Sequence, residues 1–144
     1  MPRTKLNFPE KKFDLTITIP VRITDINYGG HVGNDSLVSV IHEARMQFLH
    51  HHGYSEMEIE GTGLIMADLA VEFKNESFYD DVLSIKMAAG DITGVSFGLY
   101  YELGTTRAGK EVIIARAKTT MVCYNYAVKK VAPVPEKFKK LLLV

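Results

Sequence analysis

The sequence has a single cysteine, no excess charge of either sign and no long hydrophobic run. Cys123 has no partner cysteine in the chain, so no intrachain disulfide can form, and its free thiol fits a reducing compartment. Lys plus Arg equals Asp plus Glu at 17 each, which argues against a nucleic-acid binder with a broad positive field. No apolar run approaches the ~20 residues of a membrane span, and the N-terminal residues lack the apolar core of a signal peptide. We therefore expect a cytoplasmic protein that binds neither nucleic acid nor membranes.

The 144 residues contain no internal repeat, no low-complexity tract and no linker rich in proline or serine. We therefore expect one domain that spans residues 1–144. Hydrophobic residues make up 47% of the chain and charged residues 24%, as is ordinary for a globular protein. A chain of this length buries roughly two thirds of its unfolded surface, which is enough for a substantial core.

Alternating and helical apolar patterns predict a strand followed by a long helix. Residues 13–23 alternate polar and apolar side chains, which indicates a half-buried strand, and Pro20 favours an edge position because it lacks an amide donor. Residues 35–52 repeat apolar side chains at helical spacing, which predicts a helix of about 27 Å that Gly53 ends. The predicted buried stripe of this helix is Leu37, Val40, Ile41, Ala44, Phe48 and Leu49.

Four segments after the helix are rich in β-branched and aromatic residues, namely 64–75, 81–89, 95–103 and 111–124. Glycines and aspartates punctuate them, which favours an antiparallel meander. Residues 135–144 predict a short amphipathic helix that closes the domain. The fold class is therefore α+β, with a long central helix wrapped by a curved antiparallel sheet of about five strands.

Polar chemistry concentrates in residues 24–35, between the predicted strand and the long helix. This loop holds two carboxylates, two carboxamides, a histidine and three glycines. A helix that begins here points unpaired backbone amides and the positive end of its dipole toward the loop. We expect the amides of Gly33 and Asn34 to bind a developing oxyanion, since glycines let the backbone approach a ligand closely. A tight turn that only caps the helix is the alternative explanation for the glycines.

The loop D-I-N-Y-G-G-H-V-G-N at 25–34, followed by H-E-A-R at 42–45, resembles a known family. It is similar to the hotdog-fold acyl-CoA thioesterases, in particular the hydroxybenzoyl-CoA thioesterase-like group. Their loop reads D-x-D-x-x-G-H-V-x-N, with an E-A-R element on the following helix. The resemblance covers residues 13–125 and implies a hotdog fold. It implies hydrolysis of an acyl-CoA or acyl-carrier-protein thioester to free acid and thiol, without metal or cofactor. It also implies a homodimer or homotetramer in which sheets join edge to edge and the site lies between subunits.

The chain departs from that family at its usual catalytic carboxylate, because the second Asp of D-x-D is Asn27 here. An amide is neither a base near neutral pH nor a good nucleophile. Asp25 and His31 are then the candidates to activate water, and Asn27 to orient water or the thioester oxygen. Asp25 and His31 also have ordinary roles as a turn former and a capping residue. Glu43 lies too far along the helix to reach the loop of its own chain, so it faces a partner's site or forms a structural ion pair.

The candidate substrate-binding residues are Tyr28, Gly29, Gly30, Leu64, Met66 and Arg116. The first three belong to the polar loop. Leu64 and Met66 could line an acyl tunnel beside the helix or belong to the core. Arg116 could bind the phosphates of CoA or lie on a solvated strand face.

Two other functions fit the same residues. An R-specific enoyl-CoA hydratase of the hotdog type carries D-x-N-P-x-H, and here Asp25 and Asn27 agree with that pattern. The proline is missing and His31 comes one residue late. A non-catalytic module that binds acyl thioesters is the other alternative, and the loss of the carboxylate at Asn27 supports it.

Overall fold

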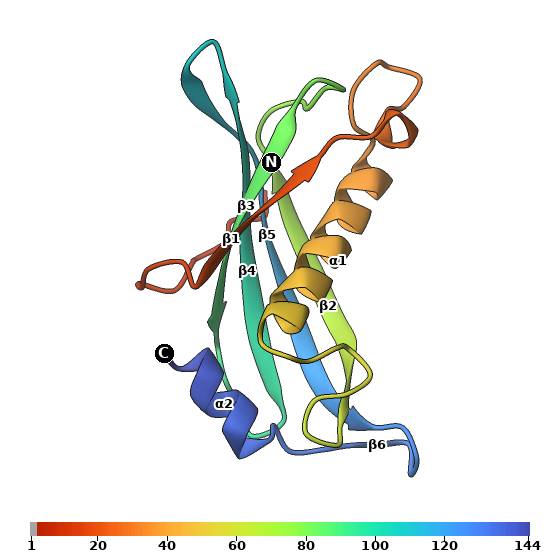
Figure 1. Cartoon of the computed structure of the whole chain (residues 1–144), viewed down its shortest axis with the longest axis vertical. Coiled ribbons are helices and arrows are strands. Elements are labelled where there is room, and N and C mark those ends of the chain that lie inside the picture. Colours follow the sequence, from red (N-terminus) through yellow and green to blue (C-terminus); the bar gives the residue numbers. More distant parts are fainter. Residues whose placement is uncertain (1–2) are drawn as a thin grey trace.

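The computed structural model describes residues 3–144, which form one six-stranded sheet and two α-helices. Helix α1 lies along one face of the long, twisted sheet, and α2 covers one end of the molecule (Figure 1). No helix among the described residues is long and apolar enough to cross a membrane. The elements are β1 (Leu15–Pro20), the 3₁₀ helix η1 (Ile23–Asp25), α1 (Asn34–His51), β2 (Gly63–Phe73), β3 (Val82–Gly90), β4 (Ser96–Arg107), β5 (Lys110–Asn125), β6 (Lys130–Val131) and α2 (Glu136–Leu142).

The sheet is antiparallel with strand order β1-β3-β4-β5-β2, and β6 pairs with the end of β5. The predicted meander is correct for β3, β4 and β5. It is wrong for β2, which pairs with β5 instead of β3. The apolar alternation that predicts a strand does not specify its neighbour, and residues 74–81 carry the chain across to β3. Both β1 and β2 are therefore edge strands, and the edge position predicted from Pro20 is confirmed.

Helix α1 begins and ends within one residue of its predicted bounds. All six residues of the predicted stripe are buried, and Arg45 is buried with them. The stripe packs on the inward side chains of the central strands, such as Ile85, Tyr101 and Ala117. This packing determines where the N-terminus of α1 lies relative to the ends of the strands.

Both ends of the chain cover parts of the sheet. The predicted C-terminal helix is confirmed as α2, and the Phe138 ring lies 5.4 Å from that of Phe97 in the core. At the other end, Phe8 packs on Tyr100 of β4 at 5.1 Å between ring centroids. Cys123 is buried in β5, and burial raises the pKa of its thiol to about 11, so it is inert at neutral pH.

Adjacent residues of α1 test this packing. Leu49 is fully buried and His50 is exposed. We expect Leu49→Ala to lower the free energy of unfolding by about 2–5 kcal/mol, because it leaves a cavity under the helix. His50→Ala should change it by no more than about 0.5 kcal/mol. Urea denaturation of both variants measures the difference, and equal effects would contradict the assigned helix face.

Candidate functional site

In the structure the polar loop belongs to the connection between β1 and α1, residues 21–33, which makes a hydrogen bond within itself and is held by the segment 74–81. Within the loop, the Asn27 amide donates to the His31 carbonyl at 2.8 Å. Val21, where the loop begins, donates its N–H to the Asp81 carbonyl at 3.1 Å. Val32, near its end, donates to the Ser77 carbonyl at 2.8 Å. Both ends of the loop are thus fixed to one neighbouring segment.

Asp25 holds the turn at the start of the loop. Its side chain is only 3% exposed and accepts hydrogen bonds from the Arg22 amide at 2.8 Å and from Arg22 Nη2 at 3.1 Å. The Asp25 carbonyl accepts the Gly33 N–H at 3.0 Å. Because both carboxylate oxygens face Arg22, the side chain is poorly placed to take a proton from water. These contacts match the turn-forming role, and they bring Asp25 no contact with His31.

Within the described part of the chain, the first amides of α1 are unpaired, whereas the amide of Gly33, one of the two predicted oxyanion donors, is not. The Gly33 N–H is already paired with Asp25, so it cannot bind an oxyanion in this conformation. Among residues 3–144, no acceptor contacts the backbone N–H of Asn34, Asp35 or Ser36. Gly33 has an ordinary φ of −69°, but a Cβ there would lie 2.7 Å from Asp35 Oδ1. The absence of a side chain at Gly33 therefore leaves room for the Asp35 carboxylate at the start of α1.

Asn27 forms a local turn beside these amides. Its Oδ1 accepts the Gly29 N–H at 2.9 Å, and its carbonyl accepts the Gly30 N–H at 3.1 Å. Gly30 has a φ of +81°, a conformation that suits glycine. The Asn27 side chain lies against Gly33, since a Cβ there would come within 3.6 Å of Asn27 Cβ. The structure thus places Asn27 next to the start of α1.

His31 faces a small hollow at the same place. Its Nδ1 lies 3.2 Å from the Val32 carbonyl, so Nδ1 is the donor, and in the neutral ring Nε2 is then an acceptor. Nε2 lies 3.9 Å from Glu76 Oε1, so an imidazolium here would have a carboxylate neighbour. The hollow has a volume of about 220 Å³ and joins the loop, α1 and the end of β2. It is lined by His31, Val32, Asn34, Leu37, Phe73, Lys74, Asn75, Glu76, Ser77 and Ile114.

Three of the other predicted residues lie away from this hollow. Glu43 lies on the outward face of α1 and accepts a hydrogen bond from Gln47 at 2.9 Å. Arg116 lies on the opposite face of the sheet, where its guanidinium covers the Phe8 ring at 3.9 Å. Leu64 is buried in the core at the start of β2.

Tyr28 and Met66 are exposed. The Tyr28 side chain is fully exposed at the tip of the loop. Met66 is 45% exposed on β2, next to the bulge between Met66 and Asp68. Tyr28 and Met66 therefore line no wall of the hollow within one chain.

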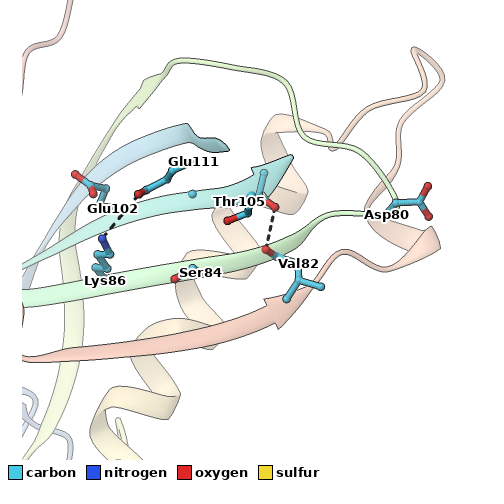
Figure 2. A pocket seen from close by; sticks show the side chains of 9 residues that line it. Asp80, Val82, Ser84, Lys86, Glu102, Thr105 and Glu111 are labelled. Carbon is cyan, nitrogen blue, oxygen red and sulfur yellow. Dashed lines mark hydrogen bonds and ion pairs between the residues drawn. The ribbon is translucent and has the colours of Figure 1, made fainter. Parts of the chain in front are cut away.

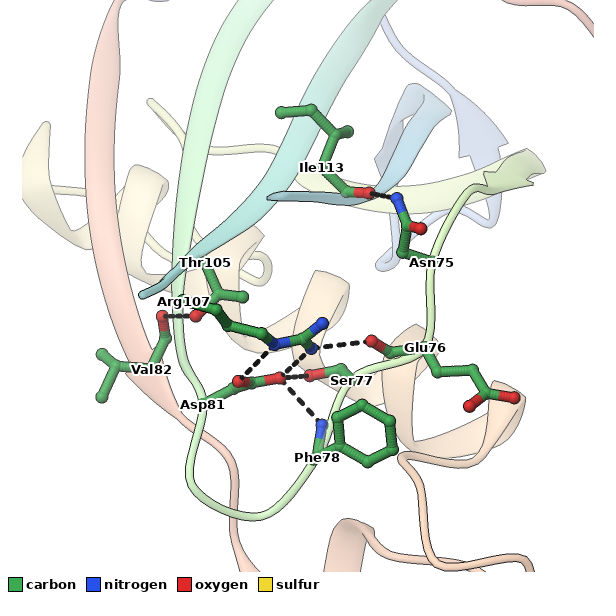
Figure 3. A network of polar contacts seen from close by, with 9 residues as sticks. All are labelled: Asn75, Glu76, Ser77, Phe78, Asp81, Val82, Thr105, Arg107 and Ile113. Atoms are coloured by element: carbon green, nitrogen blue, oxygen red, sulfur yellow. Dashed lines mark hydrogen bonds and ion pairs between the residues drawn. The ribbon is translucent and has the colours of Figure 1, made fainter. Parts of the chain in front are cut away.

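The polar partners in segment 74–81 were not found from the sequence. The predicted strands end at residue 75 and resume at residue 81, which leaves Glu76 and Ser77 without a role, yet Glu76 faces His31 and Ser77 lines the hollow. Arg107 at the end of β4 makes a bidentate pair with Asp81 and keeps the pKa of that carboxyl below its usual range (Figure 3). These contacts join residues 26 to 45 positions apart, and no local spacing signals them.

A second polar cluster joins the middle of α1 to Glu56, which follows the helix in the chain. Arg45 of the H-E-A-R element pairs with Glu56 at 3.5 Å, not with Glu43. Glu56 also contacts His42 Nε2 at 2.5 Å, and Arg45 Nη1 donates to the Tyr101 hydroxyl at 3.5 Å. None of these residues lines the hollow at the start of α1. Arg45 is instead buried with the core residues of α1, where it contacts Glu56 and Tyr101.

A larger hollow lies on the face of the sheet that is turned away from α1 (Figure 2). The side chains that line it from β3 alternate along the strand with buried core residues. Lys86 forms an ion pair with Glu111 there, at 3.8 Å. It has no contact with the polar loop. The residues that line it are Asp80, Val82, Ser84, Lys86, Glu102, Gly104, Thr105, Thr106 and Glu111.

The pairing of Asp81 with Arg107 predicts a dependence of stability on pH. The Asp81 pKa is lowered in the folded state, chiefly by hydrogen bonds from Arg107. Its contribution is therefore complete above the pKa of an unfolded aspartate, about 3.9, and is lost as the pH falls through the folded value. We expect Arg107→Met to flatten the decline of the unfolding free energy below about pH 4. Asp80→Asn, which changes an exposed neighbour, should leave the decline unchanged, and parallel profiles for wild type and Arg107→Met would contradict the pairing.

The comparisons with known proteins identify the family. The family model of the thioesterase-like superfamily matches residues 21–142, and the chain belongs to this superfamily. No curated protein sequence matches the chain with significance.

Solved structures confirm the hotdog fold. A 1,4-dihydroxy-2-naphthoyl-CoA thioesterase from Synechocystis has a TM-score of 0.79 at 21% identity, over 92% of this chain and 96% of that one. An Asp-to-Asn variant of a 4-hydroxybenzoyl-CoA thioesterase, complexed with 4-hydroxybenzoyl-CoA, has a TM-score of 0.80 at 20% identity, over 89% and 97%. A gentisyl-coenzyme A thioesterase has a TM-score of 0.76 at 20% identity, over 89% and 99%. At these identities the likeness concerns the fold.

Proposed function

We propose that the chain hydrolyses an acyl-CoA or acyl-carrier-protein thioester to a free acid and a thiol. One observation carries this proposal: His31, whose Nε2 lies 3.9 Å from Glu76 Oε1, lines the same hollow as Asn34, at the unpaired amides of α1. Membership of the thioesterase-like superfamily supports it. Structures similar to this chain belong to thioesterases for three different aromatic acyl-CoA substrates, which also supports it.

The start of α1 would bind the carbonyl oxygen of the thioester. As water adds to the carbonyl carbon, negative charge develops on this oxygen. The unpaired N–H groups of Asn34, Asp35 and Ser36 and the positive end of the helix dipole would stabilise that charge. Each well-aimed donor contributes about 3 kcal/mol to transition-state stabilisation.

His31 would be the general base. Its Nδ1–H is held by the Val32 carbonyl, so Nε2 is free to accept a proton from the attacking water. The Glu76 carboxylate, 3.9 Å away, would stabilise the imidazolium that forms. The C–S bond then breaks as the carbonyl re-forms, and the imidazolium returns the proton to the leaving thiolate. Asn27 would orient the water or the thioester oxygen, and Asp25 would hold the turn.

We also propose that two copies join through the free edge of β2 in a cytoplasmic homodimer. This edge strand has 11 residues and exposes Ile65, Met66 and Phe73. A long, exposed, apolar edge tends to pair with another strand. Phe73 also lines the hollow beside His31, so a partner strand there would add a wall to the site. Antiparallel pairing about a two-fold axis would bring the Phe73 end of one strand beside the Gly63 end of the other.

Kinetics of free-thiol release from short, long and aromatic acyl-CoAs test the proposed reaction. We expect His31→Ala to lower kcat by about 10²–10⁴-fold, because it removes the base. Asn27→Asp should raise kcat. One carboxylate oxygen can keep the hydrogen bond from the Gly29 N–H, while the other faces the helix start and can take a proton from water or attack the carbonyl carbon. His50→Ala, an exposed histidine at the far end of α1, is the control and should retain full activity.

The other two functions would give different results in this assay. A wild-type protein and an Asn27→Asp variant that both release no thiol, yet bind acyl-CoA, would replace hydrolysis with the binding module. Hydration of an enoyl-CoA without thiol release would indicate the hydratase. The structure offers this reading less support, since Asp25 pairs with Arg22 instead of joining His31.

The proposed dimer has its own test. We expect Met66→Lys to shift the mass measured by light scattering toward the monomer and to lower kcat, because it places a charge in the β2 edge. Val131→Lys on β6 introduces the same charge at a similarly exposed residue and should change neither quantity. A Met66→Lys variant with the mass of the wild-type dimer would place the interface elsewhere.

A further inference from the structure

Arg107 is not among the residues that line the hollow, yet it makes three hydrogen bonds to the segment 76–81, part of which lines it. Its Nε donates to Asp81 Oδ1 at 3.1 Å and its Nη2 donates to Asp81 Oδ2 at 2.6 Å (Figure 3). The same Nη2 donates to the Glu76 carbonyl at 2.8 Å, and the guanidinium lies 5.0 Å from the Phe78 ring centroid. This planar arrangement needs a guanidinium, because an ammonium cannot make two parallel bonds to a carboxylate.

Asp81 is the centre of this network. Its carboxylate, 8% exposed, also accepts the Ser77 hydroxyl at 2.9 Å and the Phe78 amide at 2.8 Å. One buried carboxylate thus holds two other residues of the segment 76–81, and Arg107 joins it to a third, Glu76. Loss of Arg107 would leave that charge without its partner, and the segment would have to rearrange.

The same segment carries both ends of the polar loop. The Ser77 carbonyl accepts the Val32 amide, and the Asp81 carbonyl accepts the Val21 amide. Val32 separates His31 from the start of α1, and the Glu76 carboxylate faces His31 Nε2. A shift of the segment therefore moves the imidazole relative to the amides of α1, while α1 itself stays packed on the sheet.

We infer that Arg107 is a positioning residue for the proposed hydrolysis, acting through Asp81 and Ser77 on His31. This inference rests on the proposed function. The base and the oxyanion donors belong to different elements, and only their relative placement makes them act on one thioester. A misplacement of 1 Å can cost about 10²-fold in rate, whereas apolar walls such as Phe73 and Leu37 would still bind the acyl group.

The kinetic test compares Arg107→Met, Arg107→Lys and the double variant Arg107→Met with Asp81→Asn, each shown to be folded by circular dichroism. We expect both single variants to lower kcat by about 10–100-fold and to change KM by less than about threefold. The double variant removes the unpaired charge, so its stability should exceed that of Arg107→Met while its kcat stays low. Recovery of kcat together with stability would overturn the inference, because it would make Arg107 a purely structural residue.

A second measurement is independent of activity. We expect amide hydrogen exchange at Val32 to be faster in Arg107→Met than in the wild type, because the Ser77 acceptor moves. Lys118→Met, which removes the ion pair with Asp91 on the other face of the sheet, should leave this exchange unchanged. Unchanged exchange at Val32 in Arg107→Met would overturn the inference. A wild-type protein that releases no thiol would instead overturn the proposed function, so the two failures are distinguishable.

Discussion

The packing of α1 on one face of the sheet is the constraint on which the rest of the site depends. Seven of its residues are buried, so the helix has one orientation and its first turn has one position. The unpaired amides of that turn stay rigid because the helix behind them is held by the core. A catalytic oxyanion site needs this rigidity, since donors that are already oriented cost no reorganisation during reaction. The loop before α1 has fewer packing contacts and must be held by hydrogen bonds instead.

The polar residues of the loop divide into those that build it and those left free to act. The Gly33 N–H donates to the Asp25 carbonyl, and the Asn27 side chain closes a turn on Gly29. Within residues 3–144, His31 Nε2 and the amides of Asn34, Asp35 and Ser36 remain without a hydrogen bond. A dense motif therefore carries only a few reactive groups, and most of its polar atoms maintain the backbone that presents them.

The long helix and the grouping of the loop residues can be predicted from local sequence, whereas contacts between distant segments cannot. The spacing of Leu37 to Leu49 predicts α1 to within one residue, because a one-sided core imposes that period. Asn27, His31 and Asn34 could be grouped because one short loop holds them. The pairing of β2 with β5 and the contact of Arg107 with Asp81 could not be predicted, since both join distant segments without a characteristic spacing. The paired amide of Gly33 also escaped prediction, because its acceptor depends on the loop conformation.

The amide at Asn27 has an electrostatic consequence for the proposed chemistry. A carboxylate at that place, beside the start of α1, would be stabilised by the helix dipole and could take a proton from water or attack the carbonyl carbon. A neutral carboxamide can do neither. Hydrolysis in this chain then requires water as the nucleophile and a separate base. Among the side chains that line the hollow, His31 offers a ring nitrogen that can accept a proton, and the network of Asp81 has to keep that ring in place.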